Sequence, residues 1–505
     1  MNLADHLPVL IVLLPLFGGA LSLFTGANGW RPWTWALLIT GSTFATSLAL
    51  LEAVRYAPRK TLIYALGSWP GEYGIEYRVD VLNAYVLCVV SLLALVCTVY
   101  ARRSIEDEIP DDRHHMFYAV WLLAIAGLLG ITVTGDTFNI YVLLEISSLT
   151  VYCLIAMGKD RDRRALTASL KYLILGSIGA TFILLGIGYL LMLTGTLNMA
   201  DMHAQLMEMR DRGELLHNRT VLIAFAFLMV GLALKMALFP LHQWLPNAYT
   251  YAPSAVSALI ASTATKVGVY MTFRFVFTLF GGVYDSLHNL DVFIACACAG
   301  VLVSGVRAAQ QNNAKRVLAY SSVGQLAYIV LGFSLLNHSG VTASVIHIFN
   351  HAVTKGGMFM ALGCVAYRVG GTEIRHLQGI GRRMPLTMAA FVAGGLGLIG
   401  MPLTAGFVSK WYLVQAALDE GFWWVAFVVL LGSLLALIYV WRLVEVIYFK
   451  APDPQYADKD IREAPLTMLV PTWSLIGASI YFGIDASWTA EIADAAARTL
   501  LGGFS

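Results

Sequence analysis

Residues 234–270 read LKMALFPLHQWLPNAYTYAPSAVSALIASTATKVGVY. The stretch is apolar over most of its length, yet it contains two lysines, Lys235 and Lys266, and a proline, Pro240, that interrupts a helical run. An ionisable residue at bilayer depth costs about 2.5 kcal/mol or more, so it indicates function rather than packing. The stretch therefore predicts membrane-spanning helices that carry buried charge.

The whole chain has the composition of an integral membrane protein. Hydrophobic residues make up 58% of its 505 residues and charged residues 13%, whereas a soluble chain has about 45–50% apolar and about 25% charged residues. The formal net charge of +2 gives no support to nucleic acid or an acidic substrate as a partner. The six cysteines lie in apolar runs without the spacing of a metal or disulfide site, and we find no cofactor motif.

Apolar runs of the length needed to cross a bilayer, about 20 residues, recur along the chain. They predict an all-α polytopic membrane protein with about 14 transmembrane helices, and no strand alternation of the β-barrel type competes with this interpretation. The expected spans are 7–25, 33–53, 80–100, 116–134, 137–158, 169–193, 220–244, 254–280, 290–308, 316–336, 341–369, 385–418, 421–449 and 466–484.

The basic residues of the loops predict the orientation, because Lys and Arg concentrate on the cytoplasmic side. One set of loops is rich in them: Arg102, Arg103, Arg113, Lys159, Arg161, Arg163, Arg164, Lys315, Arg316, Arg368, Arg375, Arg382, Arg383, Lys450, Lys459 and Arg462. The other set of loops carries fewer basic residues: Arg55, Arg59, Lys60, Arg78, Arg210, Arg212 and Arg219. We therefore expect a multi-pass protein of the inner (plasma) membrane with both termini on the outer side.

An internal repeat divides the chain. We expect N-terminal helices in 1–115, a first block of five spans in 116–281, a second block of five in 290–450, and a C-terminal loop, last span and tail in 451–505. The fourth span of each block holds a break, around Pro240 and around Pro402. Because five is odd, the blocks are inverted, and inverted repeats with broken helices are typical of transporters. The alternative is that both prolines only kink ordinary helices.

Several ionisable residues lie inside the expected spans and are candidates for a proton path. They are Glu145, Lys235, Lys266, His347, His351, Lys355 and Lys410. The members of span eleven, His347, His351 and Lys355, recur every four residues and therefore share one helical face. Since histidine titrates near neutral pH, the stripe indicates a proton relay. Two alternatives remain: the histidines hydrogen-bond neighbouring helices, or the H-x-x-x-H spacing grips zinc, for which a third ligand is lacking.

Glu145 and Lys235 form the second element of the hypothesis. Burial favours the neutral amine and a nearby carboxylate favours the charged amine, so approach and separation of the two groups would make a proton switch. The alternative is a static buried ion pair that fixes helix packing. Arg274 and Lys171 lie nearer span ends, and we expect their side chains to extend to the membrane interface.

Four segments resemble the antiporter-like subunit family. They are TGDTFNIYVLLEISSL (134–149), residues 234–270, RVLAYSSVGQLAYIVLG (316–332) and HIFNHAVTKGGMFM (347–360). The family includes the large subunits of Mrp-type Na⁺/H⁺ antiporters and the proton-pumping membrane subunits of respiratory complex I and of membrane-bound hydrogenases. TGTLNMADM (194–202) is most similar to the D subunit of the Mrp type.

The resemblance implies roles for the buried residues. Glu145 would pair with Lys235, and Lys266 with the span-eleven histidines would pass protons to Lys410, at a position where the family has Lys or Glu. It implies a secondary transporter subunit rather than an enzyme, with other membrane subunits as partners, protons and Na⁺ as its ions, and no cofactor of its own. The alternative is the membrane subunit of a redox-driven complex; coupling to inorganic carbon uptake is a weaker one. The Na⁺ site stays open and would lie on a partner.

Overall fold

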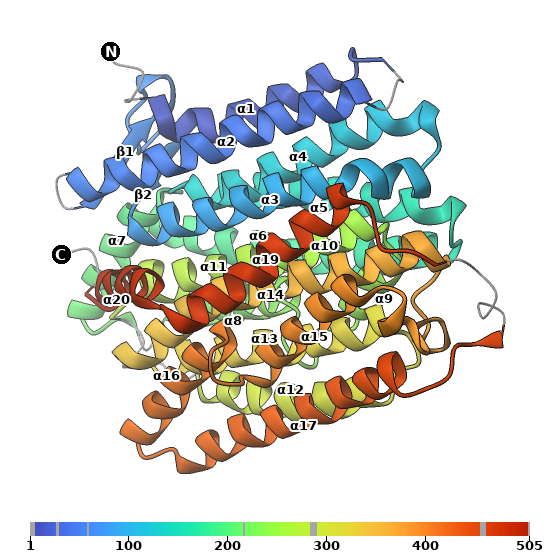
Figure 1. The fold of residues 1–505 in the computed structure, drawn as a ribbon. Helices are drawn as coiled ribbons and strands as arrows, with labels where there is room; N and C mark the ends of the chain where they lie inside the picture. The colour runs from blue at the N-terminus through green and yellow to red at the C-terminus, as the bar shows by residue number, and fades with distance from the viewer. Residues whose placement is uncertain are drawn as a thin grey trace.

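In a bilayer the backbone must satisfy its own hydrogen bonds, so an apolar run of spanning length folds as a helix. The computed structural model describes residues 6–26, 30–57, 60–215, 218–282, 290–454 and 461–502, and these form a bundle of helices lying side by side (Figure 1). Within the described residues, ten helices are long and apolar enough to cross a membrane. The predicted fold class, an all-α polytopic membrane protein, is confirmed.

The first six expected spans each correspond to one helix. These are α1 (Leu7–Ser22), α2 (Trp30–Tyr56), α3 (Val81–Glu108), α4 (His114–Val133), α5 (Thr137–Ala156) and α6 (Arg164–Thr194). Polar residues begin two of them: the Asp80 side chain caps α3, and the Asp136 side chain caps α5. Each accepts a hydrogen bond from a backbone N–H that has no partner within the helix.

The next two spans are interrupted. Span seven consists of α8 (Arg219–Lys235) and α9 (Leu245–Tyr251), with residues 236–244 outside any α-helix around Pro240. Span eight consists of α10 (Ser254–Ser262) and α11 (Ala264–Phe273), which continues as a π-helix over Arg274–Leu279. The break around Pro240 coincides with the predicted one. No proline or glycine lies at the break around Thr263, so the sequence does not predict it.

The remaining spans follow the same pattern. They are α12 (Asp291–Ala309), α13 (Ala314–Ser334), α14 (His338–Val369), the pair α15 (Pro385–Ile399) and α16 (Ala405–Asp419), α17 (Trp423–Tyr448) and α19 (Leu466–Ile484). Gly400 and Leu403 have positive φ between α15 and α16, so the helix stops there and restarts. The break around Pro402 therefore also lies where the sequence predicts it.

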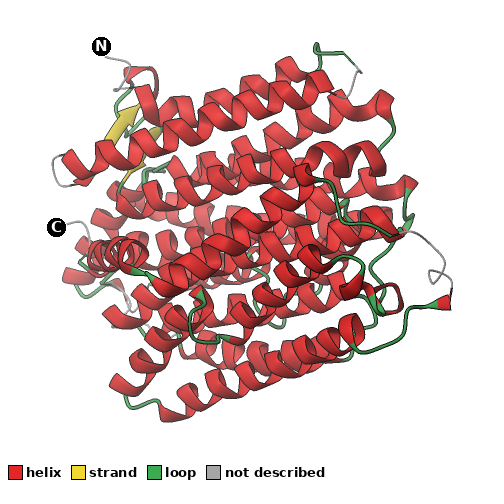
Figure 2. Cartoon of the chain, viewed as in Figure 1, coloured by secondary structure: helices red, strands yellow, loops and turns green. Residues whose placement is uncertain are grey.

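The connections gather at two ends of the bundle. At the hairpin end lie the strands β1 (Leu62–Ala65) and β2 (Glu76–Val79), paired antiparallel, together with the helices α7 (Met199–Asp211) and α20 (Ser487–Leu501) (Figures 1 and 2). None of these four elements is among those predicted from the sequence. The loops after α3, α5, α12, α14 and α17 lie at the opposite, basic end. Of the basic residues used to predict orientation, Arg59 and Lys459 lie outside the described residues.

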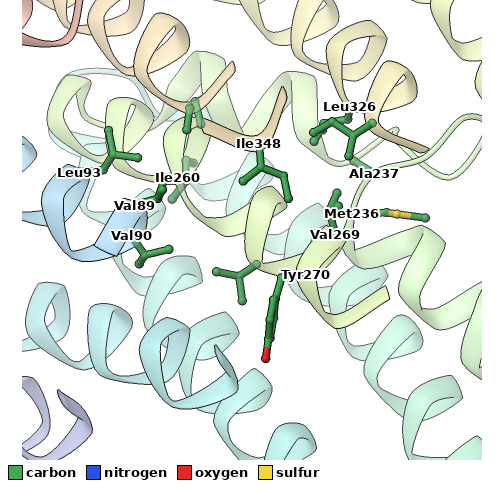
Figure 3. Close-up of a cluster of buried hydrophobic side chains, with 14 of the residues drawn as sticks. Val89, Val90, Leu93, Met236, Ala237, Ile260, Val269, Tyr270, Leu326 and Ile348 are labelled. Carbon is green, nitrogen blue, oxygen red and sulfur yellow. The ribbon is translucent and has the colours of Figure 1, made fainter. Parts of the chain in front are cut away.

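Helix α14 lies at the centre of the bundle. It contacts α3, α10, α13, α15, α16, α19 and α20, and nearly every residue from Gly340 to Ala366 is buried. Around it, apolar side chains from α3, α10, α11, α13 and the Pro240 break fill the interior (Figure 3). Polar groups on α14 are thus surrounded by apolar packing, which strengthens their electrostatic interactions.

Candidate functional site

The break after α8 places Lys235 inside the bundle. Hydrogen bonds hold the backbone on either side of Lys235. Met236 N–H donates to the Leu232 carbonyl at 2.9 Å, and Trp244 Nε1–H donates to the Leu234 carbonyl at 2.9 Å. Close packing adds to this, because Gly268 of α11 approaches the backbone of Lys235 and Met236 so nearly that a Cβ there would lie 3.2 Å from Met236. Lys235 is therefore fixed at a contact between α8 and α11.

The Lys235 side chain is directed to α5. Nζ donates to the Ser148 hydroxyl at 3.0 Å, and Ser148 lies one turn beyond Glu145. Among the described ion pairs none joins Lys235 to Glu145, although the two charges interact electrostatically. The Glu145 Oε1 atom is buried and accepts no hydrogen bond from the described residues. The two predicted partners are thus neighbours without direct contact.

A small cavity lies beside Lys235 and Ser148. Its volume is about 20 Å³, and it is lined by Ser147, Ser148 and Lys235 together with Ala264, Val267 and Gly268 of α11, among others. A space of this size holds about one water molecule. The cavity connects the α5–α8 contact to the helix that carries Lys266.

Lys266 lies on α11, three residues past the Thr263 break, with 1% of its surface exposed. Its Nζ donates to the Ala261 carbonyl of α10. Its charge also interacts with His347, His351 and Lys355 of α14. Lys266 therefore joins the broken span eight to the histidine stripe.

The stripe on α14 has the predicted helical spacing. The rings of His347 and His351 lie 6.0 Å apart between centroids and are stacked, with an interplanar angle of 14°. Lys355 Nζ donates to the Leu318 carbonyl of α13 at 2.9 Å. Both ring nitrogens of His351 are buried and make no hydrogen bond to the described residues. His351 is therefore the group of the stripe without a fixed partner.

His347 is held from two sides. Gln325 Oε1 accepts from Nε2 at 3.1 Å, so Nε2 carries a proton, and the Ser409 hydroxyl lies 2.7 Å from Nδ1. The Gln325 amide group also donates through Nε2 to the Leu398 carbonyl at 3.3 Å. Sequence reasoning missed Gln325 and Ser409. Gln325 could have been found by the rule applied to the charged residues, since an amide inside an apolar span is also costly.

Lys410 closes the series at the second break. Its Nζ donates to the carbonyls of Leu398 at 2.8 Å and Ile399 at 3.0 Å and to the Ser433 hydroxyl at 3.0 Å. These carbonyls end α15, where the helix dipole carries partial negative charge. Because the Leu398 carbonyl accepts from both Lys410 and Gln325, a continuous set of hydrogen bonds joins His347 to Lys410.

The expectation for Arg274 is wrong. Its side chain does not extend to an interface but is buried, with Nη2 2.6 Å from Asp80 Oδ1 and Nε donating to the Tyr270 hydroxyl at 2.9 Å. The physical reason is the buried carboxylate at the start of α3, which compensates the guanidinium where it stands. Lys171, in contrast, is exposed on α6.

Comparison with known proteins finds membrane subunits of two kinds of complex. Residues 134–436 match the family described as NADH:quinone oxidoreductase/Mrp antiporter, TM. The N subunit of the NADH-quinone oxidoreductase of Desulforudis audaxviator is 40% identical over 92% of this chain and 93% of its own length. The D subunit of the Na⁺/H⁺ antiporter of Bacillus subtilis is 27% identical, covering 98% of this chain and 97% of its own.

A solved structure shares the arrangement of helices. A chain in the Mrp complex from Dietzia sp. superposes with a TM-score of 0.89 at 25% identity, covering 99% of this chain and 98% of that one. Coverage of this extent spans both halves of the bundle. This chain is a multi-pass membrane subunit that belongs to the NADH:quinone oxidoreductase/Mrp antiporter transmembrane family.

Proposed function

We propose that this chain translocates protons through the Glu, Lys and His residues of its membrane-spanning helices, as the proton-carrying subunit of a multisubunit Na⁺/H⁺ antiporter. Protons would pass between Lys235, under the control of Glu145, and Lys266, then along His347, His351 and Lys355, and finally to Lys410. The similarity to the D subunit of a Na⁺/H⁺ antiporter over 98% of the chain supports the coupling of proton movement to Na⁺ exchange.

The observation that carries the proposal is the position of His351. Its ring is buried, stacked on His347 and within the electrostatic influence of Lys266 and Lys355, yet neither nitrogen has a hydrogen-bond partner among the described residues. A buried polar group without a partner costs free energy, about 1–3 kcal/mol. A ring that only packs would not need nitrogens there, whereas a ring that accepts and releases a proton does.

The proposal is tested in membrane vesicles that contain the complex. Lys235→Ala should abolish the pH equilibration that follows addition of Na⁺, and Glu145→Ala should do the same while the protein still inserts. A wild-type rate in Lys235→Ala vesicles would remove Lys235 from the path. The exposed Lys171→Ala variant is the matched control and should transport normally.

One observation favours a different source of energy for proton translocation. The 40% identity to a NADH-quinone oxidoreductase subunit exceeds the 27% identity to the antiporter subunit. In that case electron transfer on partner subunits would power the same proton path. Purifying the tagged chain with its partners and recording a visible absorption spectrum separates the two: a featureless spectrum favours the antiporter, and iron–sulfur or flavin absorption favours the redox pump.

The orientation belongs to the same proposal. The basic end would lie in the cytoplasm, because its loops carry most of the Lys and Arg residues. The hairpin end, with the start of α1 and with α20, would then face outward from the plasma membrane. Labelling of a single cysteine introduced at exposed Arg498, by a reagent that does not cross the membrane, checks this in whole cells.

A further inference from the structure

A second polar region lies at the hairpin end, away from the site described above. It is a cavity of about 760 Å³, here called the vestibule, between the β-hairpin, the start of α3, α7, the π-helix and α20. Its lining includes Arg78, Asp80, Asn83, His203, Arg274 and Thr278. The space exceeds many times the roughly 30 Å³ that one water molecule occupies in the liquid. The vestibule can therefore hold water close to the buried Arg274.

A buried ion pair forms part of the lining of the vestibule. The side chains of Asp80 and Arg274 are 11% and 9% exposed, and Arg274 Nη2 also donates to Asn83 Oδ1. The Tyr270 hydroxyl accepts from Arg274 and donates to the Thr132 carbonyl at 2.8 Å (its ring is shown in Figure 3). A guanidinium is not deprotonated in proteins. The guanidinium therefore cannot relay protons, and while it is paired the Asp80 carboxylate stays charged, so the closed pair is a barrier to protons.

The barrier and the central lysine share a helix. Lys266, Tyr270 and Arg274 follow one another at intervals of four residues, so they lie along one side of α11 and its extension. The helix is bounded by the Thr263 break on one side and the π-helix Arg274–Leu279 on the other. Single π turns inside α-helices are rare and often mark functional sites. In this structure Lys266 donates to Ala261, in the preceding helix, and not toward Tyr270.

We infer that the vestibule is the mouth of the proton path on the hairpin side and that Asp80 and Arg274 form its gate, which is closed in this structure. When the pair separates, water of the vestibule reaches Lys266, and the ammonium group releases its proton to that water or regains one from it. Asp80 and Arg274 are positioning residues, since neither carries the proton. The inference rests on the proposed function and adds the route by which protons reach one side of the membrane.

Asp80→Asn tests the gate and keeps the cap of α3. The Asp80 oxygen accepts from Asn83 N–H at 3.0 Å as the cap of α3, and asparagine caps a helix about as well as aspartate. The control is Asp136→Asn, which changes the cap of α5 at the same end; that carboxylate accepts from Asn139 N–H at 2.6 Å and has no arginine partner among the described residues.

The measurement is passive proton leak into proteoliposomes that contain the complex at equal amounts, under an imposed pH difference. Asp80→Asn should raise the leak by about tenfold, because loss of one partner leaves the other charge buried without compensation, and Asp136→Asn should match the wild type. The double variant Asp80→Asn/Lys266→Ala should lose the added leak. An Asp80→Asn leak no greater than that of Asp136→Asn, or a leak that persists in the double variant, would overturn the gate.

A second variant keeps the inference testable if Asp80→Asn does not insert. Arg274→Lys retains the positive charge but loses the planar donor set that holds Tyr270 and Asp80 together, so it should also leak more than wild type. An Arg274→Lys leak at the wild-type level would count against the gate. Failure of the proposed function looks different: Lys266→Ala alone would then leave driven proton transport intact, whatever the gate variants do.

Discussion

Lys235 donates its hydrogen bond to Ser148, with 3.0 Å between Nζ and Oγ, and not to the Glu145 carboxylate one turn earlier on α5. The Glu145 Oε1 atom is left buried without a hydrogen bond from the described residues. In the proposed switch this is the arrangement in which lysine and carboxylate are apart. Ser148 would then be the group that holds the lysine away from Glu145.

Ser148→Ala tests that role. The variant removes the acceptor of Lys235, and a hydrogen bond to a charged group contributes about 1.5–3 kcal/mol. We expect proton transport in vesicles to slow by roughly 10- to 100-fold, the rate change that corresponds to this free energy. Ser147→Ala is the matched control, because Ser147 lines the same small cavity but bonds the Leu144 carbonyl of its own helix. Equal rates for the two variants would contradict the role of Ser148.

Gln325 is the predicted link between the histidine stripe and the second break. Gln325→Leu keeps the size of the side chain but removes the bonds to His347 and to the Leu398 carbonyl. Because this amide joins the two, transport should fall by about tenfold or more when it is lost. Gln311→Leu, which alters an exposed amide bonded to the Arg307 carbonyl, should leave it unchanged. Normal transport with Gln325→Leu would separate Lys410 from the path.

The second break depends on a close approach of two glycines. A Cβ on Gly406 would lie 1.9 Å from the Gly397 carbonyl oxygen, so α15 and α16 can meet as they do only without a side chain there. Gly406→Ala should destabilise the protein by about 1–3 kcal/mol through overpacking. Thermal unfolding in detergent measures this. Gly477→Ala, in α19, meets no atom within 4 Å and should unfold at the wild-type temperature, so a Gly406→Ala protein that matches it would contradict the packing.

The sequence predicted those elements of the fold that depend on interactions within a short stretch of the chain. Apolar runs predicted the helices because a bilayer leaves the backbone no other structure, and Pro240 and Pro402 predicted the breaks because proline cannot continue a helix. The break at Thr263 has no such residue, and the strand Leu62–Ala65 is too short to stand out from its surroundings. Those elements depend on contacts with the rest of the molecule.

The sequence predicted the residues of the candidate site but not their hydrogen-bond partners. The cost of burying charge singled out Lys235, Lys266 and Lys410, and all three are buried. Their hydrogen-bond partners depend on shifts of a few ångströms between helices, which no spacing rule supplies. Arg274 shows the limit best, since its partner Asp80 lies 194 residues away.

His351 offers the most direct test of the proton path. Its ring makes no hydrogen bond to the described residues, so His351→Ala removes a titratable group without breaking a hydrogen bond to them. The measurement is proton movement in proteoliposomes of the purified complex, started by Na⁺ or, if the complex carries redox centres, by an electron donor. The control is His338→Ala, at the exposed start of α14. The account predicts that proton movement is lost in His351→Ala and kept in His338→Ala; wild-type proton movement in His351→Ala would contradict it.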